Sequence, residues 1–235
     1  MSISEEAIQF AKAHKIEISR RLTDPRLFLP SEAPISFFMA GSPGAGKTEY
    51  SKNMLVALAM NPKHHPVRID GDELRNEIPG YIGSNSSEVQ GAVSILLRET
   101  YQRTLINRQT VIVDGTFSNY DKARENVGRS LRRGREVAIM YMYQRPEAAW
   151  QFTVAREKIE GRNIPKEVFI DQFLRAKDTV SRIHTEFQSQ VTIYLIKKNY
   201  QNNQVEFLDF LRPGGPGLDA FISETYTREQ LIDLL

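Results

Sequence analysis

Residues 41–48 constrain the fold of this chain more than any other part of its sequence. They read Gly-Ser-Pro-Gly-Ala-Gly-Lys-Thr, which is the spacing of a phosphate-binding loop. Glycines let the backbone wrap around an anion with its amide N–H groups pointing inward, and a following helix directs its positive end at the phosphates. An apolar run precedes the segment and a helical pattern follows it. The sequence therefore predicts a strand, a loop and a helix that together bind a nucleotide.

Each residue of this loop is expected to contact the cofactor, which we take to be ATP with Mg²⁺. Lys47 would bridge the β- and γ-phosphates, and the Thr48 hydroxyl would ligate Mg²⁺. The nucleotide-binding residues predicted from the motif are Gly41, Ser42, Pro43, Gly44, Ala45, Gly46, Lys47 and Thr48.

Strands and helices are expected to alternate along most of the chain. Apolar runs predict strands at 35–40, 67–70, 111–114, 137–143 and 191–197, and helical patterns lie between them. This alternation indicates an α/β P-loop fold with a doubly wound, mainly parallel, five-stranded sheet and helices on both faces. Residues 205–210 would add an edge strand, and 227–235 a terminal helix.

The N-terminal part is predicted to be a separate helical element. Residues 3–22 have an amphipathic pattern, and Ser2 with Glu5 can form a capping box. Three prolines between 25 and 34 then interrupt the chain. We expect a helical appendage at 1–33 and a P-loop kinase domain at 34–235, with a lid at about 156–166. The helix would either cover the nucleotide site or pack on the sheet.

The composition argues against several classes of function. The chain has no cysteine, which excludes disulfides, thiolate nucleophiles and cysteine-based zinc sites. Its formal net charge of +2 gives no reason to expect a dedicated nucleic-acid binder. No apolar run approaches the roughly 20 residues of a membrane span, and the N-terminus lacks a signal-peptide pattern. We expect a cytoplasmic protein with no membrane partner.

Aspartates end two of the expected strands. Asp70 and Asp72 follow the second strand, at the sheet edge where ligands of open α/β sheets bind. A carboxylate there can accept the proton of an attacking hydroxyl, a role that we assign to Asp72. Asp70 would orient Asp72 or cap the next helix. Asp114 ends the third strand and would act through water on Mg²⁺. Simple capping is the alternative for all three.

Two arginines bracket the expected lid. Arg156 and Arg162 lie six residues apart, near a helix end and a short Gly/Pro-bounded loop. Arginines over a γ-phosphate stabilise charge during transfer, and a lid excludes water. The alternative is a solvated charge cluster.

A second group of arginines follows the third expected strand. Such a run can contact a nucleic acid or a diphosphate, although it is more often a solvated helix face. Its members are Arg124, Arg129, Arg132, Arg133 and Arg135.

The order and spacing of four motifs resemble the zeta-toxin family of P-loop kinases, from about residue 35 to 191. The motifs are G-S-P-G-A-G-K-T, I-D-G-D, V-I-V-D-G-T and A-R-E-K-x-E-G-R-x-I-P. The resemblance implies an ATP- and Mg²⁺-dependent kinase, the toxin of a bacterial toxin–antitoxin pair. The best-known acceptor in that family is the 3′-hydroxyl of UDP-N-acetylglucosamine, which makes a nucleotide-sugar the expected substrate and an antitoxin protein a possible partner.

The resemblance also implies roles for individual residues. Lys47 and Thr48 match the ATP- and Mg²⁺-binding positions, Asp72 matches the base, and Arg156 and Arg162 match the lid arginines. Asp114 stands where better-known members carry a glutamate. By the same matching, the acceptor-binding residues would be Asp72, Glu99, Thr116, Ser118 and Asn126.

Two of these acceptor positions depart from the family pattern. Ser118 stands where better-known members have an arginine, and Asn126 stands where they have a threonine. A 5′-hydroxyl polynucleotide kinase, or another small-molecule kinase, is therefore an alternative, although nucleic acid is the less favoured partner. A non-catalytic protein switched by ATP is an alternative of another class.

Overall fold

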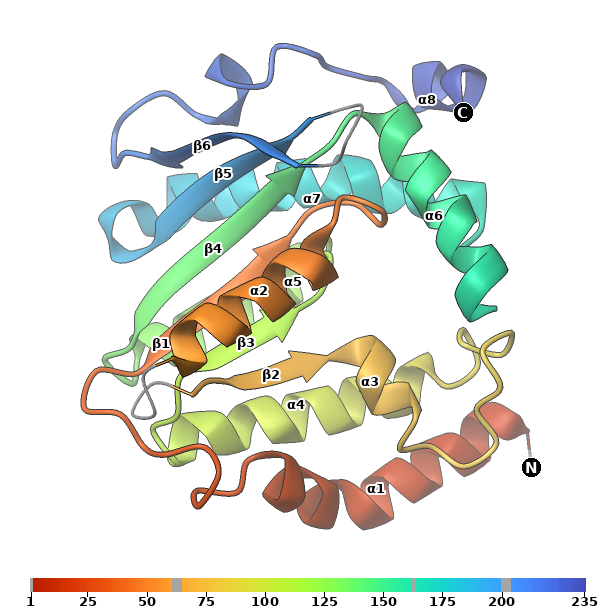
Figure 1. Ribbon diagram of the computed structural model, residues 1–235, viewed down its shortest axis with the longest axis vertical. Helices are drawn as coiled ribbons and strands as arrows, with labels where there is room; N and C mark the ends of the chain where they lie inside the picture. Colours follow the sequence, from red (N-terminus) through yellow and green to blue (C-terminus); the bar gives the residue numbers. More distant parts are fainter. Residues whose placement is uncertain (1, 61–64, 162–163, 200–203) are drawn as a thin grey trace.

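The computed structural model describes residues 2–60, 65–161, 164–199 and 204–235. Six strands form one sheet in the order β2-β3-β1-β4-β5-β6 (Figure 1). The strands are β1 (Ile35–Ala40), β2 (Val67–Asp70), β3 (Val111–Asp114), β4 (Glu136–Tyr143), β5 (Thr192–Lys198) and β6 (Val205–Leu211). The first five pair in parallel, which confirms the predicted fold class. β6 pairs antiparallel with β5 and is the additional edge strand.

Eight α-helices lie in the described ranges of the chain, and α2–α7 lie between successive strands. They are α1 (Ile3–Leu22), α2 (Lys47–Ala59), α3 (Gly71–Arg75), α4 (Gln90–Ile106), α5 (Tyr120–Leu131), α6 (Pro146–Glu160), α7 (Lys166–Phe187) and α8 (Arg228–Leu234). None of the helices in the described part of the chain has the length and apolar character needed to cross a membrane.

Alternate residues of the strands point to two separate cores, which is why helices cover both faces of the sheet. From β1, Phe38 and Ala40 enter the larger core with α4, α5 and α7. Met39 enters a smaller core with Met54 and other apolar residues of α2. Figure 1 shows α2 on one side of the sheet, with α4 and α7 behind it.

Helix α1 packs along α4 rather than over the phosphate-binding loop (Figure 1). The predicted capping box of Ser2 and Glu5 is present at its start. Its Ala7, Ala11 and Ile18 belong to the same buried cluster as the central sheet. The structure therefore shows neither of the two placements that the sequence left open, because α1 packs on α4 and not directly on the sheet.

Candidate active site

The loop between β1 and α2 has a backbone path that only glycine permits at two positions. Gly41 and Gly44 have φ values of 135° and 71°, in the region that favours glycine. A Cβ atom on Gly41 would lie 2.3 Å from the Met142 carbonyl oxygen, and one on Gly44 would lie 1.9 Å from that of Ala149. The close approach of β4 and α6 to the loop thus fixes its curvature, which fits the phosphate cradle expected from the motif.

Lys47 begins α2 and folds back over this loop. Its side chain is buried, and its Nζ donates a hydrogen bond of 2.6 Å to the Ser42 carbonyl oxygen. The lysine therefore closes one side of the loop and places its charge beside the N-terminus of α2, where anions bind. On the other side, the Gly41 N–H donates to the Thr116 carbonyl oxygen at 3.1 Å.

We predict that Gly44→Ala weakens ATP binding and any ATP-dependent activity by about 100-fold or more, because the loop must shift by the order of an ångström to admit the methyl group. Titration calorimetry with ATP measures the loss. Gly217→Ala is the matched control, since a Cβ there meets nothing within 4 Å. Equal affinities of the two variants would contradict the prediction.

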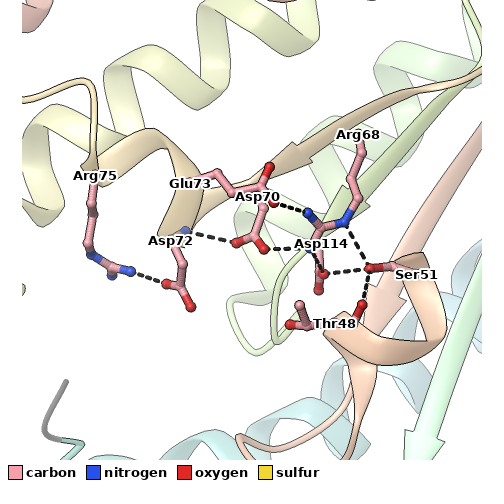
Figure 2. Close-up of polar contacts among 8 residues, drawn as sticks. All are labelled: Thr48, Ser51, Arg68, Asp70, Asp72, Glu73, Arg75 and Asp114. Carbon is pink, nitrogen blue, oxygen red and sulfur yellow. Dashed lines mark hydrogen bonds and ion pairs between the residues drawn. The ribbon is translucent and has the colours of Figure 1, made fainter. Parts of the chain in front are cut away.

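The sheet register brings two carboxylates together beside α2. Asp70 and Asp114 are paired across the ends of β2 and β3. Between them lies the buried guanidinium of Arg68, whose Nη2 donates to Asp70 Oδ2 at 2.5 Å and to Asp114 Oδ2 at 2.6 Å (Figure 2). The Ser51 hydroxyl donates to Asp114 at 2.7 Å and accepts from Arg68 Nε at 2.9 Å. This network fixes Asp114 next to the start of α2.

Burial and neighbouring charges shift the pKa values of Asp70 and Arg68 in this network. Burial raises the pKa of Asp70, and the negative charge of Asp114 raises it further. Burial alone would lower the pKa of Arg68, but its hydrogen bond to Asp114 and the nearby carboxylates raise that pKa. Arg68 therefore stays positively charged and compensates two carboxylates that would otherwise repel each other in a poorly hydrated place.

Asp72 is held by contacts on two sides. Asp70 is the N-cap of α3 and accepts a hydrogen bond of 2.8 Å from the Asp72 backbone N–H, so capping is one of the roles expected for Asp70 that the structure shows. The Asp72 carboxylate forms an ion pair with Arg75, which is itself buried and donates to Gln90 on α4 at 2.7 Å (Figure 2). About a third of the Asp72 side chain remains exposed, so an acceptor can reach its carboxylate.

Several of the predicted site residues line a cavity of about 490 Å³. Thr48 from the start of α2, Asp70 and Asp72 from the β2–α3 junction, and Arg156 from α6 all line it. Tyr81 adds an aromatic wall. Arg162, the second predicted lid arginine, lies outside the described residues. The structure thus brings the end of the phosphate loop, the expected base and one lid arginine to a single cavity.

Other predicted residues lie outside the lining of this cavity. Thr116 and Ser118 share a hydrogen bond of 2.8 Å in the segment that contacts Gly41. The backbone carbonyl of Asn126, on α5, accepts from the Tyr101 hydroxyl at 3.1 Å. Glu99, on α4, forms an ion pair of 3.7 Å with Lys15 of α1.

Sequence reasoning missed Arg68 and Arg75, which hold the carboxylates of the site. A signal for Arg68 was present, because residues two apart in a strand point to the same face and Arg68 is two before Asp70. Arg75 likewise stands three residues after Asp72, the spacing of neighbours on a helix.

Thr48 and Asp114 supply oxygen donors of the kind that Mg²⁺ prefers. No group of three or more histidine or acidic side chains able to hold a metal ion occurs within the described residues. Mg²⁺ is commonly bound by one or two protein oxygens together with substrate phosphates, and Thr48 and Asp114 could supply such oxygens.

A family comparison matches most of the chain. The model of the family described as Zeta toxin matches residues 18–209. The chain belongs to the Zeta toxin family. No curated protein was found to match this family member in sequence.

Solved structures similar to this Zeta toxin family member support the same fold. One belongs to the PezAT chromosomal toxin–antitoxin system of Streptococcus pneumoniae, with a TM-score of 0.66 and 17% identity over 100% of this chain and 90% of that chain. Another is the AvrRxo1-ORF1:AvrRxo1-ORF2 complex with ATP, with a TM-score of 0.62 and 15% identity over 94% and 70% of the two chains. At these identities the likeness concerns the fold.

Proposed function

We propose that this member of the Zeta toxin family is a kinase that transfers the γ-phosphoryl group of ATP to a hydroxyl of a small molecule. The observation that carries the proposal is the cavity shared by Thr48, Asp72 and Arg156. The end of the predicted phosphate-binding loop, a carboxylate able to accept a proton and a cation line this one open cavity, and these are parts that phosphoryl transfer needs.

In this mechanism the acceptor oxygen attacks the γ-phosphorus while the bond from that phosphorus to the bridging oxygen of ADP breaks. Asp72 takes the hydroxyl proton, and Arg75 keeps the Asp72 carboxylate in place. Lys47 and the loop amides bind the phosphates, and Arg156 offsets the charge on the moving phosphoryl group. Mg²⁺ bound by Thr48 and Asp114 would shield the phosphate charges.

The acceptor that we propose is a UDP-amino sugar, with UDP-N-acetylglucosamine as the first candidate. Family membership supports this choice, and a cavity of about 490 Å³ is within the range that holds small-molecule ligands. The solved relative from a toxin–antitoxin system supports the further proposal that this protein is a toxin with an antitoxin partner.

The structure gives the polynucleotide-kinase alternative little support. Two of the arginines that favoured it are engaged on the α5 surface, Arg124 with Glu186 at 2.5 Å and Arg129 with Glu125 at 3.9 Å. Neither lines the cavity of the candidate site.

The purified protein with ATP and UDP-N-acetylglucosamine tests the proposal. We expect the mass of the sugar nucleotide to increase by one phosphoryl group, and no increase with Lys47→Ala. Mass spectrometry reads the product. Transfer to a 5′-hydroxyl oligonucleotide but not to the sugar nucleotide would overturn the acceptor, and ATP binding without transfer to either would overturn the kinase.

A variant of Glu99 tests the implied role of that residue. We predict that Glu99→Gln changes the KM for the acceptor by no more than about twofold, because the carboxylate pairs with Lys15 at 3.7 Å and does not line the cavity. Steady-state kinetics measure the effect, with Lys15→Gln as the matched control that removes the same pair. A tenfold rise in KM for Glu99→Gln alone would instead support acceptor binding by Glu99.

A further inference from the structure

A second cavity lies at the amino-terminal ends of the parallel strands, opposite the end that carries the candidate active site. It measures about 470 Å³, and its lining includes Arg108, Arg133 and Arg135. Arg108 lies just before β3, and Arg133 and Arg135 lie just before β4. Pro34, which also lines the cavity, immediately precedes β1. Because β1 is six residues long, about 20 Å of strand separates this cavity from the phosphate-binding loop.

Arg135, which lines this cavity, is a charged residue that is almost completely buried. Only 4% of it is exposed. Its Nε donates to the Ser36 hydroxyl at 2.8 Å, and its Nη2 donates to the Gln109 carbonyl oxygen at 2.6 Å. Its Nη1 is buried without a hydrogen-bond partner. Burial, together with the positive charges of Arg133 and Arg108, lowers the pKa of Arg135 to about 10.

A buried guanidinium normally has a carboxylate partner, because an uncompensated charge is costly to desolvate. Among the described residues, no acidic side chain forms an ion pair with Arg135, Arg133 or Arg108. Arg108 uses its Nη2 to donate to the backbone oxygen of Glu32 at 2.8 Å. The cavity therefore gathers three arginines and one acidic residue, Glu32, around a buried N–H group of Arg135 that lacks an acceptor.

This arrangement divides the basic run seen in the sequence into two groups. Arg124 pairs with Glu186 of α7, and Arg129 pairs with Glu125 one turn earlier on α5. Arg133 and Arg135 face the cavity instead, where Arg108 joins them from a distant part of the chain. Leu105 and Ile106 supply an apolar wall beside the charges.

We propose that this second cavity is a binding site for an oxyanion-bearing small molecule, whose phosphate or carboxylate group contacts Arg108, Arg133 and Arg135 and whose apolar part lies against Leu105 and Ile106. Guanidinium groups match the geometry of both oxyanions. The site is separate from the candidate kinase site and does not depend on the proposed reaction.

Nuclear magnetic resonance of the full chain tests this site with inorganic pyrophosphate as the probe. The Gly134 amide lies between two of the arginines and reports on the cavity, while the Gly44 amide reports separately on the phosphate loop. At constant ionic strength, we expect the Gly134 signal to shift in a saturable way. Arg133→Ser should weaken that binding by about tenfold or more, since a charge-assisted contact is lost.

Arg132→Ser is the matched control, because it removes the adjacent charge from outside the cavity lining. It should change the affinity by less than about twofold. A parallel titration with citrate shows whether carboxylates bind as phosphates do. A Gly134 shift that never saturates, or equal losses in Arg132→Ser and Arg133→Ser, would overturn the proposal. Tighter binding of an oligonucleotide than of pyrophosphate at Gly134 would also overturn it, in favour of a nucleic-acid surface.

Discussion

Asp72→Asn is expected to lower the kcat for phosphoryl transfer by about 10²–10⁴-fold, the usual contribution of a positioned general base. The amide keeps the size of the side chain but cannot accept the acceptor's proton. Because Asp72 lies on α3 and is not one of the residues that would bind the phosphates of ATP, the affinity for ATP should change much less than kcat. Single-turnover rates and ATP titrations on the same preparation separate these two effects.

Asp178→Asn is the control for this substitution, since Asp178 is an exposed aspartate on α7 that pairs with Arg182 at 3.6 Å. It should leave kcat unchanged. If Asp72→Asn retained more than a tenth of the wild-type rate, Asp72 would not be the base. An ATP-switched interaction protein would keep its activity in this variant, so the same experiment separates the two classes of function.

Arg68→Met is expected to lower the free energy of unfolding by about 3–5 kcal/mol, the usual cost of removing one partner from a buried ionic network. The Arg68 side chain is 5% exposed, and the side chains of its two main partners, Asp70 and Asp114, are 9% and 4% exposed. Without the guanidinium these carboxylates face each other with no cation between them. Urea unfolding followed by circular dichroism measures the change.

Two further variants show whether the loss of the Arg68 charge causes the expected decrease in the free energy of unfolding. Arg21→Met breaks an exposed ion pair of the same 2.5 Å length with Glu77, and should cost no more than about 1 kcal/mol. Adding Asp70→Asn to Arg68→Met should recover part of the loss, because it removes one of the opposed charges while asparagine still caps α3. A loss below 1 kcal/mol for Arg68→Met would show that water already compensates these carboxylates.

The parts of the fold that could be predicted from sequence are those governed by local pattern. The apolar runs of β1 and β3 each end at a predicted site position, the phosphate loop and Asp114, so the same motif indicates both the strand and the end of the sheet where the site should lie. The Ser2–Glu5 capping box and the edge strand expected at 205–210 were also local signals, whereas the antiparallel pairing of β6 with β5 was not predicted. The predicted count of five strands described the parallel part of the sheet, and β6 makes the sixth.

The parts that could not be predicted depend on contacts between distant residues. Arg68 gains its role only when the register of β2 and β3 sets Asp70 opposite Asp114. Arg108 and Arg135 are brought together only because β3 and β4 both flank β1. The acceptor-binding role of Glu99 was implied only by the resemblance to the family. That resemblance gives no information about the ion pair between Glu99 and Lys15 of α1.

The packing of α1 on α4 has a consequence for how the chain is made. A ribosome releases Ile3–Leu22 long before Gln90–Ile106, and the phosphate loop emerges between them. Until α4 appears, Ala7, Ala11 and Ile18 have no partner surface and remain in water. Contacts that close such long loops form late in folding. The nascent protein therefore keeps the apolar face of α1 exposed until α4 has been made, and chaperones can bind that face in the interval.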